Sequence, residues 1–206
     1  MRILEQFDDF LSFPTTAREL GLRANYNPCD FLNSKWIYSG LRSNDTVDEN
    51  LKKEYITKIE NKLNVKLSNV TTMFHVNPGI SYRGFPHIDE PENHKLAALI
   101  YLSPNPSLDS GTTVYENSEL TITGEVYRSM IEIVYNITIP DNNYYKQECK
   151  QALDRLRETL IVKRKFENKF NSCLVYNQNL LHAPDYYFGS NLLDSRLTLL
   201  LFAEMI

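Results

Sequence analysis

The feature that most constrains the fold is a nearly continuous apolar run, KLAALIYLS, at residues 95–103. A run of this kind is typical of a strand buried on both faces of a sheet, because a half-buried strand alternates apolar and polar side chains. Pro104 and Pro106 follow it and stop the strand, since proline cannot donate a ladder hydrogen bond. We therefore expect a sheet protein with this segment near the centre of the sheet.

Other segments predict further strands around that centre. In residues 70–76, Phe74 and Val76 alternate with Met73 and His75, which is the period-two pattern of a strand. Aromatic residues make up 12% of the chain, and this content favours sheet-rich packing over a helical bundle. The remaining strand candidates lie at residues 112–116, 120–123, 130–139, 170–176 and 196–203.

Two helices are predicted in the N-terminal third of the chain. Residues 46–63 carry apolar side chains on one helical face, and Thr46 with Glu49 forms a capping-box pattern. The spacing predicts a surface helix packed against the sheet. A shorter helix is expected to begin with Pro14 near its first position and to end at Gly21, because proline and glycine favour these opposite ends of a helix.

The chain between residues 117 and 169 is expected to form an insertion that contains a third helix. Residues 141–161 place apolar side chains on one stripe, with Asp141 as a candidate N-cap. The basic residues 163–165 are interpreted as the solvated end of this helix. Long loops in compact domains are usually functional, so we expect a cover or wall beside a binding site. Packing on the outer sheet or on a second subunit is an equally good alternative.

Length and segment order indicate one α+β domain that is mainly β. Two hundred and six residues correspond to a single domain of ordinary size. Many short strands, with helices gathered at the N-terminus and in one insertion, favour a sandwich or barrel. We expect residues 1–206 to form this domain, with residues 1–69 as an N-terminal helical support and residues 70–206 as the barrel core.

Charge and cysteine content exclude several classes of protein. The net charge is -4, so the chain lacks the basic surface needed for bulk nucleic-acid binding. Its three cysteines form no C-x-x-C pair, which argues against a disulfide framework and a thiolate zinc site. No run approaches the ~18 apolar residues of a membrane span, and Glu5, Asp8 and Asp9 interrupt any signal-peptide core. These features predict a cytoplasmic protein in a reducing compartment, without a membrane partner.

The sequence His87-Ile88-Asp89 is the first candidate for a metal site. Side chains two residues apart in extended backbone point to the same side, so His87 and Asp89 can reach one ion. By itself the pattern also fits a loop histidine beside a solvated aspartate. His182 offers a third ligand, because it lies between an apolar strand and Pro184, which ends that strand.

Two histidines and one carboxylate form the facial triad of non-haem Fe(II) oxygenases, which leaves open positions for substrate and O2. Zinc hydrolases use the same residue types. Arg196 separates the two classes, because it begins an apolar strand where a buried charge needs an anionic partner. Thr198 lies on the same strand face, and its hydroxyl could help to hold a carboxylate. The alternative is an arginine that reaches solvent at the mouth of the strand.

Together these motifs resemble the Fe(II)/2-oxoglutarate-dependent dioxygenase superfamily, in its prolyl-4-hydroxylase-like branch. The resemblance covers roughly residues 70–206. The motifs occur in the order His87-x-Asp89, a strand ending in Tyr101-Leu102, the segment GTTVY at residues 111–115, His182, and Arg196-x-Thr198. One departure is Ser110-Gly111, where this branch commonly has a Gly-Gly pair.

The resemblance implies a double-stranded β-helix, a cupin-like jelly-roll barrel whose mouth holds the metal. It implies that His87, Asp89 and His182 are the catalytic residues that bind Fe(II). It also implies that Arg196 pairs with the distal carboxylate of the co-substrate 2-oxoglutarate, in the bidentate geometry that favours arginine over lysine. Thr198 and Tyr101 would hydrogen-bond the same carboxylate.

The activity implied by the resemblance is hydroxylation of an unactivated C–H bond. O2 and 2-oxoglutarate are consumed, succinate and CO2 are released, and ascorbate serves as a supporting reductant. The presence of Asp89 favours hydroxylation, because related halogenases lose this carboxylate to make room for halide. The substrate is expected to be a peptide or a small molecule, with peptidyl proline, free amino acids, small metabolites and nucleobases in that order.

Two alternatives are weighed against this activity. A cupin-like metal-binding or sensing protein would keep the barrel and the metal without turnover. Demethylation of nucleic-acid bases is disfavoured, because the acidic chain has no basic stripe to grip the nucleic acid. A homodimer is left open by the sequence.

Overall fold

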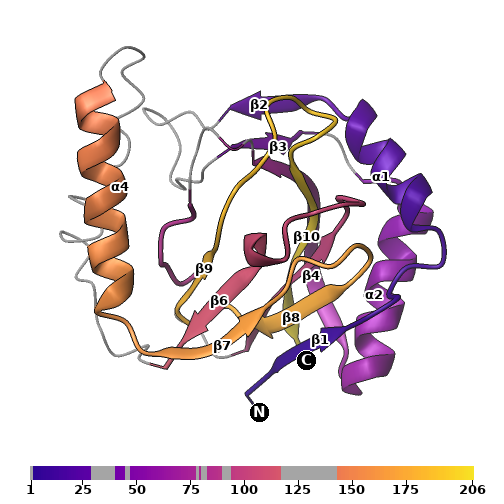
Figure 1. Cartoon of the computed structure of the whole chain (residues 1–206). Coiled ribbons are helices and arrows are strands. Elements are labelled where there is room, and N and C mark those ends of the chain that lie inside the picture. Colours follow the sequence, from indigo (N-terminus) through magenta and orange to yellow (C-terminus); the bar gives the residue numbers. More distant parts are fainter. Residues whose placement is uncertain are drawn as a thin grey trace.

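The computed structural model describes residues 2–28, 40–44, 47–77, 79, 83–89, 94–116 and 143–206, with the side chains of 143–149 and 152 left aside. Two antiparallel sheets form a jelly-roll barrel (Figure 1). The larger sheet has the strand order β1 (Leu4–Phe7), β8 (Cys173–Asn177), β5 (Lys95–Tyr101), β10 (Arg196–Met205), β4 (Leu67–Asn77), β3 (Leu41–Ser43) and β2 (Tyr26–Pro28). The smaller sheet has the order β7 (Val162–Phe166), β6 (Thr112–Tyr115) and β9 (His182–Pro184).

The apolar run predicted at residues 95–103 becomes β5, the third of seven strands and buried on both faces. On one face, Leu96 and Ile100 join the core beneath the N-terminal helices. On the other face, Leu99 and Tyr101 join the core inside the barrel, together with Val114 of the smaller sheet. The prediction of a central, doubly buried strand is confirmed, because each face of β5 has its own hydrophobic layer.

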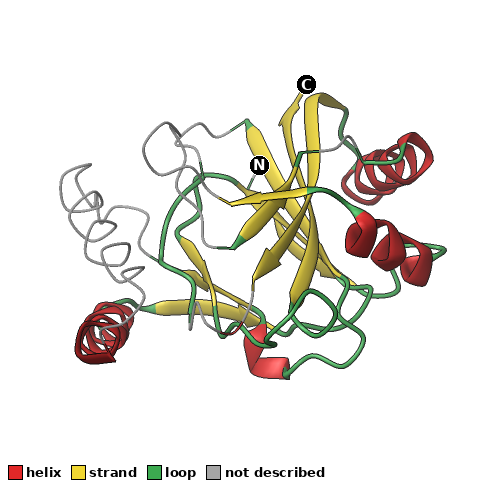
Figure 2. Cartoon of the chain, turned by 90° about the horizontal axis from the view of Figure 1, so that it is seen from above, coloured by secondary structure: helices red, strands yellow, loops and turns green. Residues whose placement is uncertain are grey.

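Helices α1 (Pro14–Arg23) and α2 (Glu49–Leu63) cover the outer face of the larger sheet, whereas α4 (Asn143–Glu158) lies on the opposite side of the molecule (Figure 2). Tyr55 and Ile59 of α2 are fully buried against the sheet, so the predicted amphipathic helix is confirmed. None of the helices in the described parts of the chain is both long enough and apolar enough to cross a membrane.

The two N-terminal helices begin and end differently from the sequence prediction. Asp48 is the N-cap of α2, and its side chain accepts hydrogen bonds from the backbone N–H groups of Asn50 and Leu51. Thr46, the predicted cap, lies outside the described residues. Gly21 does not end α1, which continues to Arg23. A Cβ at Gly21 would lie 2.9 Å from the Phe74 ring, so glycine here allows close packing of helix on sheet.

The predicted insertion contributes a strand to the barrel. Residues 163–165 were expected at a solvated helix end, but they belong to β7, which pairs with β6 at the edge of the smaller sheet. Charged side chains on an edge strand hinder pairing with other chains, which explains a basic sequence at this place. Gly111 permits this pairing, because a Cβ there would lie 1.8 Å from the Phe166 carbonyl oxygen.

Some predictions for the insertion fall outside the described residues. These are the strand candidates at 120–123 and 130–139 and the N-cap Asp141. The N-terminal region, expected to be a helical support, also supplies strands β1, β2 and β3 of the larger sheet. The strand predictions at residues 70–76, 112–116, 170–176 and 196–203 correspond to β4, β6, β8 and β10.

Candidate metal centre

The structure brings together the three residues predicted to bind a metal. One nitrogen of each imidazole of His87 and His182 and one oxygen of Asp89 all lie within 4.8 Å of one another. The backbones of His87 and His182 exchange two hydrogen bonds, of 2.8 and 2.9 Å, across an isolated antiparallel bridge. Their rings consequently lie side by side, with centroids 4.4 Å apart. The pairing of segments distant in sequence therefore creates the cluster.

Both imidazoles turn their Nε2 atoms toward the cluster. The Nδ1 atoms of His87 and His182 lie 2.7 and 2.9 Å from the carbonyl oxygens of Phe85 and Leu180. A carbonyl only accepts, so each Nδ1 carries a hydrogen, and in the neutral ring each Nε2 keeps its lone pair. The Nε2 atoms lie 3.5 and 3.8 Å from the Asp89 oxygens. This donor set, with ring orientation fixed by carbonyl groups, fits a divalent metal ion.

Burial and neighbouring charges shift the pKa values of the three residues, and these shifts set their protonation for metal binding. Burial and the neighbouring His87 lower the pKa of His182 to about 4, so this imidazole is neutral at neutral pH. Burial alone would raise the pKa of Asp89, but the two histidines and Arg42 outweigh burial and hold it at about 2. Burial opposes a charge on His87 too, yet the Asp89 carboxylate raises the pKa of His87. Asp89 is therefore a carboxylate over the whole neutral range.

Tyr176 of β8 contacts two of the three candidate ligands. Its buried hydroxyl donates to Asp89 Oδ2 at 3.2 Å and lies 3.0 Å from His182 Nε2. Burial, reinforced by the Asp89 charge, raises the pKa of Tyr176 well above 10, so the phenol keeps its hydrogen. The sequence motifs do not include this residue. Its place in an apolar strand, six residues before His182, was the available signal.

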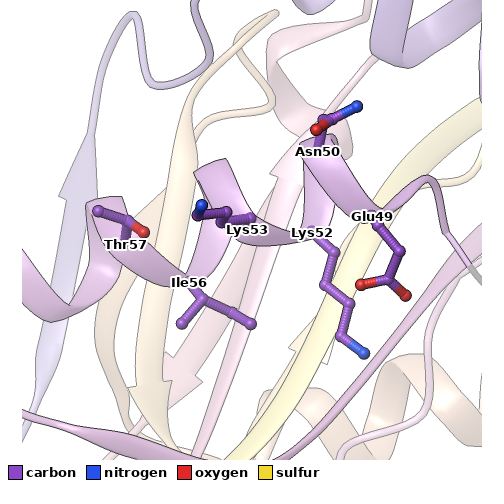
Figure 3. Close-up of a pocket in the computed structure, with 6 residues that line it drawn as sticks. All are labelled: Glu49, Asn50, Lys52, Lys53, Ile56 and Thr57. Atoms are coloured by element: carbon purple, nitrogen blue, oxygen red, sulfur yellow. The ribbon is translucent and has the colours of Figure 1, made fainter.

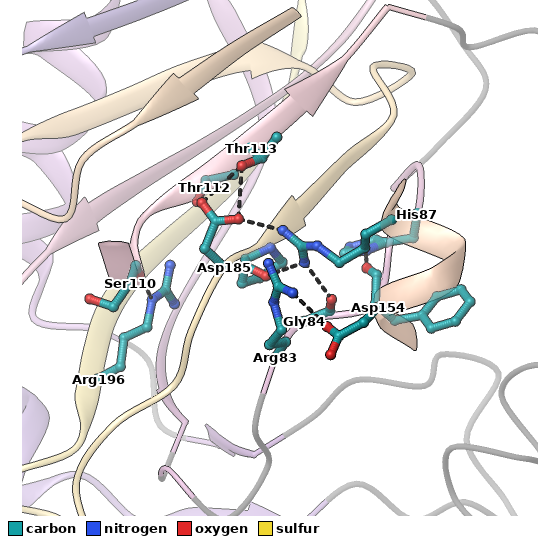
Figure 4. A network of polar contacts seen from close by, with 12 residues as sticks. Arg83, Gly84, His87, Ser110, Thr112, Thr113, Asp154, Asp185 and Arg196 are labelled. Atoms are coloured by element: carbon teal, nitrogen blue, oxygen red, sulfur yellow. Dashed lines mark hydrogen bonds and ion pairs between the residues drawn. The ribbon is translucent and has the colours of Figure 1, made fainter. Parts of the chain in front are cut away.

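Arg196 lies at the start of β10 and is 2% exposed. Its Nε donates to the Ser110 carbonyl oxygen at 3.1 Å, and Figure 4 shows the two side by side. Its Nη2 is buried and has no hydrogen-bond partner among the described residues. The alternative of an arginine reaching solvent is therefore wrong. A buried guanidinium nitrogen without a partner is costly, so the site fits an additional anionic group.

Thr198 and Tyr101 lie next to Arg196 inside the barrel. They face each other across β10 and β5, and both are fully buried. The Tyr101 hydroxyl shares a 2.8 Å hydrogen bond with Thr112, and its ring centroid lies 5.3 Å from the Arg196 guanidinium carbon. The structure thus brings together the three residues predicted to hold a carboxylate. Their function as ligands of a co-substrate stays a prediction.

Helix α4 is anchored close to the triad by a buried arginine. Arg157 donates to the carbonyl oxygens of Gly84 and Pro184, at 2.9 and 3.0 Å, and forms an ion pair with Asp185 (Figure 4). Asp185 also accepts a hydrogen bond from Thr113. Gly84 precedes His87 by three residues, and Pro184 follows His182 by two. Arg157 thus joins the two segments that carry the histidines, although nothing in the sequence distinguishes it from neighbouring basic residues.

A shallow pocket on the outer surface of α2 contains none of the triad residues. Its lining consists of Glu49, Asn50, Lys52, Lys53, Ile56 and Thr57 (Figure 3). This helix packs on the face of the larger sheet that points away from the barrel interior. Within the described residues, the triad is the one group of three side chains placed to ligate a metal.

We predict that Arg157→Leu lowers the free energy of unfolding by about 3 to 5 kcal/mol, because it leaves the buried Asp185 carboxylate without its cation. Urea denaturation measures the change. Arg155→Leu is the matched control, since Arg155 is exposed on the same helix and its loss should cost less than about 0.5 kcal/mol. Equal effects of the two substitutions would contradict a specific contribution of Arg157.

Comparison with known proteins supports the fold. No family model and no curated protein matches this sequence. Among solved structures, a prolyl hydroxylase from Trichoplax adhaerens in complex with a hypoxia inducible factor peptide is 14% identical, with a TM-score of 0.60 over 98% of this chain and 83% of that one. A Pseudomonas putida prolyl-4-hydroxylase is also 14% identical, with a TM-score of 0.55 over 99% and 93%.

A third structure, HygX from Streptomyces hygroscopicus with nickel and 2-oxoglutarate bound, is 12% identical, with a TM-score of 0.54 over 98% and 82% of the two chains. The same fold also occurs in SnoN, a non-heme alpha ketoglutarate dependent epimerase, at a TM-score of 0.53. Each likeness covers nearly all of this chain. The chain therefore has the jelly-roll fold of the prolyl hydroxylases and of other 2-oxoglutarate-dependent enzymes, as the sequence resemblance predicted.

Proposed function

We propose that the protein is an Fe(II)/2-oxoglutarate-dependent oxygenase that hydroxylates a peptidyl or small-molecule substrate. One observation carries the proposal. Inside one barrel, a His-Asp-His cluster with two imidazole lone pairs lies with a buried arginine, Arg196, whose Nη2 has no partner in the described structure. A metal ion would satisfy the cluster, and the carboxylate of a small acid would satisfy the arginine.

The triad supports Fe(II) over a closed structural metal site. His87, Asp89 and His182 would hold Fe(II) with two imidazoles and one carboxylate, the donor set of sites that keep positions open for co-substrate and O2. Bound Fe(II) and 2-oxoglutarate would supply an oxidant strong enough to attack a C–H bond, with release of succinate and CO2.

The residues around Arg196 would bind the other end of 2-oxoglutarate. The guanidinium matches a carboxylate in charge and in its paired N–H groups, while Thr198 and Tyr101 add hydroxyls beside it. The apolar side chains of Leu174 and Leu200 lie in the same interior layer and would exclude water from this pair. HygX, which has the same fold, was solved with 2-oxoglutarate bound, and this supports the choice of co-substrate.

The proposed substrate site is next to helix α4. Its anchor Arg157 contacts the segments on both sides of the triad, which supports the predicted insertion as a wall beside the barrel mouth. Prolyl hydroxylases with this fold support a peptide substrate, whereas HygX with hygromycin B bound supports a small molecule. Asp89 favours hydroxylation, although the fold also occurs in an epimerase and a carbocyclase.

The alternative function is a metal-binding protein without turnover. The buried Arg196 favours an enzyme, because a protein that only binds a metal does not need a carboxylate site. Succinate release tests this directly, in a screen of peptides, amino acids and small metabolites with Fe(II), ascorbate, 2-oxoglutarate and O2. We expect succinate in excess of protein, increased by the true substrate. Metal binding without succinate would favour the alternative.

Anaerobic addition of Fe(II) and 2-oxoglutarate should give a visible charge-transfer band, because the keto acid would chelate the iron. We expect His87→Ala and His182→Ala to abolish the band, since each removes one imidazole ligand. His94→Ala is the matched control, because His94 is exposed and does not belong to the cluster. A band of unchanged intensity in either triad variant would show that the metal is bound elsewhere.

Arg196→Ala should weaken 2-oxoglutarate binding by about 2 to 5 kcal/mol while Fe(II) binding is retained, because the substitution removes the cation that a buried carboxylate would face. Calorimetric titration of the metal and then of 2-oxoglutarate separates the two effects. Arg18→Ala serves as the control, since Arg18 of α1 donates to the Leu102 carbonyl oxygen on the helix side of the sheet. If the Arg196 variant lost affinity for Fe(II) and for 2-oxoglutarate equally, the result would show that Arg196 supports the fold and does not bind the co-substrate.

A further inference from the structure

We propose that Tyr176 is a positioning residue of the metal centre, because its phenol holds one oxygen of Asp89 and leaves the other oxygen for the metal. This inference rests on the proposed function and extends it to a residue outside the triad. It concerns the coordination number of the metal, which decides how many positions stay open for co-substrate and O2.

The phenol of Tyr176 lies against two residues of the triad. Its oxygen is 3.2 Å from Asp89 Oδ2 and 3.0 Å from His182 Nε2, so it touches two candidate ligands at once. The Tyr176 and His182 rings also pack together, with centroids 4.6 Å apart and planes tilted by 53°. The backbone of Tyr176 pairs with Ala97 and Leu4 in the middle of three strands, which fixes the position of the ring.

A buried hydroxyl in this place needs a polar partner. Tyr176 is 4% exposed and belongs to the apolar interior layer of the barrel, where phenylalanine would pack equally well. A hydroxyl without a hydrogen bond in such a layer costs free energy. Within the described residues, the Tyr176 hydroxyl is hydrogen-bonded to Asp89 and His182 alone. The hydroxyl oxygen therefore contributes polar contacts to the metal centre, whereas the ring contributes to the apolar packing.

The single phenol hydrogen has two acceptors within reach when no metal is bound. Asp89 Oδ2 is one, and the lone pair of His182 Nε2 is the other, since the hydrogen of that imidazole lies on Nδ1 toward Leu180. A metal ion on Nε2 would occupy this lone pair. The phenol could then donate only to the Asp89 carboxylate, so metal binding would strengthen this hydrogen bond.

The consequence concerns how Asp89 would bind. With Oδ2 engaged by Tyr176, Oδ1 is the oxygen left to face a metal, and it lies 3.5 Å from His87 Nε2. A carboxylate that binds through one oxygen leaves a coordination position open, whereas one that binds through both oxygens fills it. Open positions are what distinguishes a facial triad from a closed site. Tyr176 would thus keep the proposed oxygenase site open.

The test compares Tyr176→Phe with the wild-type protein, using Co(II) alone as the probe. We expect about 10- to 100-fold weaker Co(II) binding, because loss of a hydrogen bond to a ligating carboxylate has effects of this size. The visible d–d absorption of bound Co(II) should also change, since its position and intensity depend on coordination number. A structural role alone would leave this spectrum unchanged.

The matched control is Tyr55→Phe. Tyr55 is also fully buried against the larger sheet, but its hydroxyl lies 3.3 Å from the Leu199 carbonyl oxygen on the helix side. Its variant should bind Co(II) with wild-type affinity and spectrum. Thermal unfolding verifies that both variants are folded. Infrared difference spectra of the wild-type protein give a second measurement, because the separation of the carboxylate stretching bands distinguishes binding through one oxygen from binding through two.

The possible results separate this inference from the proposed function. Wild-type affinity and spectrum in Tyr176→Phe, or a carboxylate bound through both oxygens in the wild type, would overturn the inference alone. A phenolate charge-transfer band with Fe(III) that disappears in Tyr176→Phe would also overturn it, because Tyr176 would then be a ligand. If the wild-type protein binds no metal at the triad, the proposed function fails and the inference fails with it.

Discussion

The two backbone hydrogen bonds that His87 and His182 exchange are the interaction on which the candidate site depends. They join a segment that precedes β5 to β9, which lies more than ninety residues later in the chain. The histidines face each other at this bridge, and Asp89 completes the cluster from two residues away. Arg157 reinforces the same contact from α4 through the carbonyl oxygens on either side of it. A change in this pairing would separate the ligands.

The structure contains buried charges that the protein alone does not fully compensate. Asp185 and Arg157 neutralise each other, whereas Arg196 keeps a buried nitrogen without a partner in the described structure. Burial of such a group opposes folding. Proteins retain this kind of cost mainly at binding sites, where a ligand supplies the missing partner. Arg157 already has an anionic partner and Arg196 does not, so the expected anion is placed at Arg196. The net charge of the chain gives no such position.

Much of the fold could be predicted because it depends on patterns that are local in sequence. The apolar run at β5, the alternation in β4 and the amphipathic α2 each follow from side-chain periodicity, and all three are present. The predictions were wrong where a tertiary contact overrides local preference. Gly21 lies inside α1 because Phe74 packs against it, and the basic residues of β7 form a strand because β6 offers an edge.

By itself, the sequence determined which residues could form a metal and anion site, because His87, Asp89, His182 and Arg196 have the required chemistry and lie close to predicted strands. Only the tertiary structure decided that the triad atoms converge, and that Tyr176 and Arg157 belong to the same neighbourhood. The physical reason is that spacing along one strand fixes the direction of a side chain, whereas its neighbours across strands depend on register. Between strands that lie far apart in the chain, register is fixed by the packing of the whole barrel, which spacing along one segment does not give.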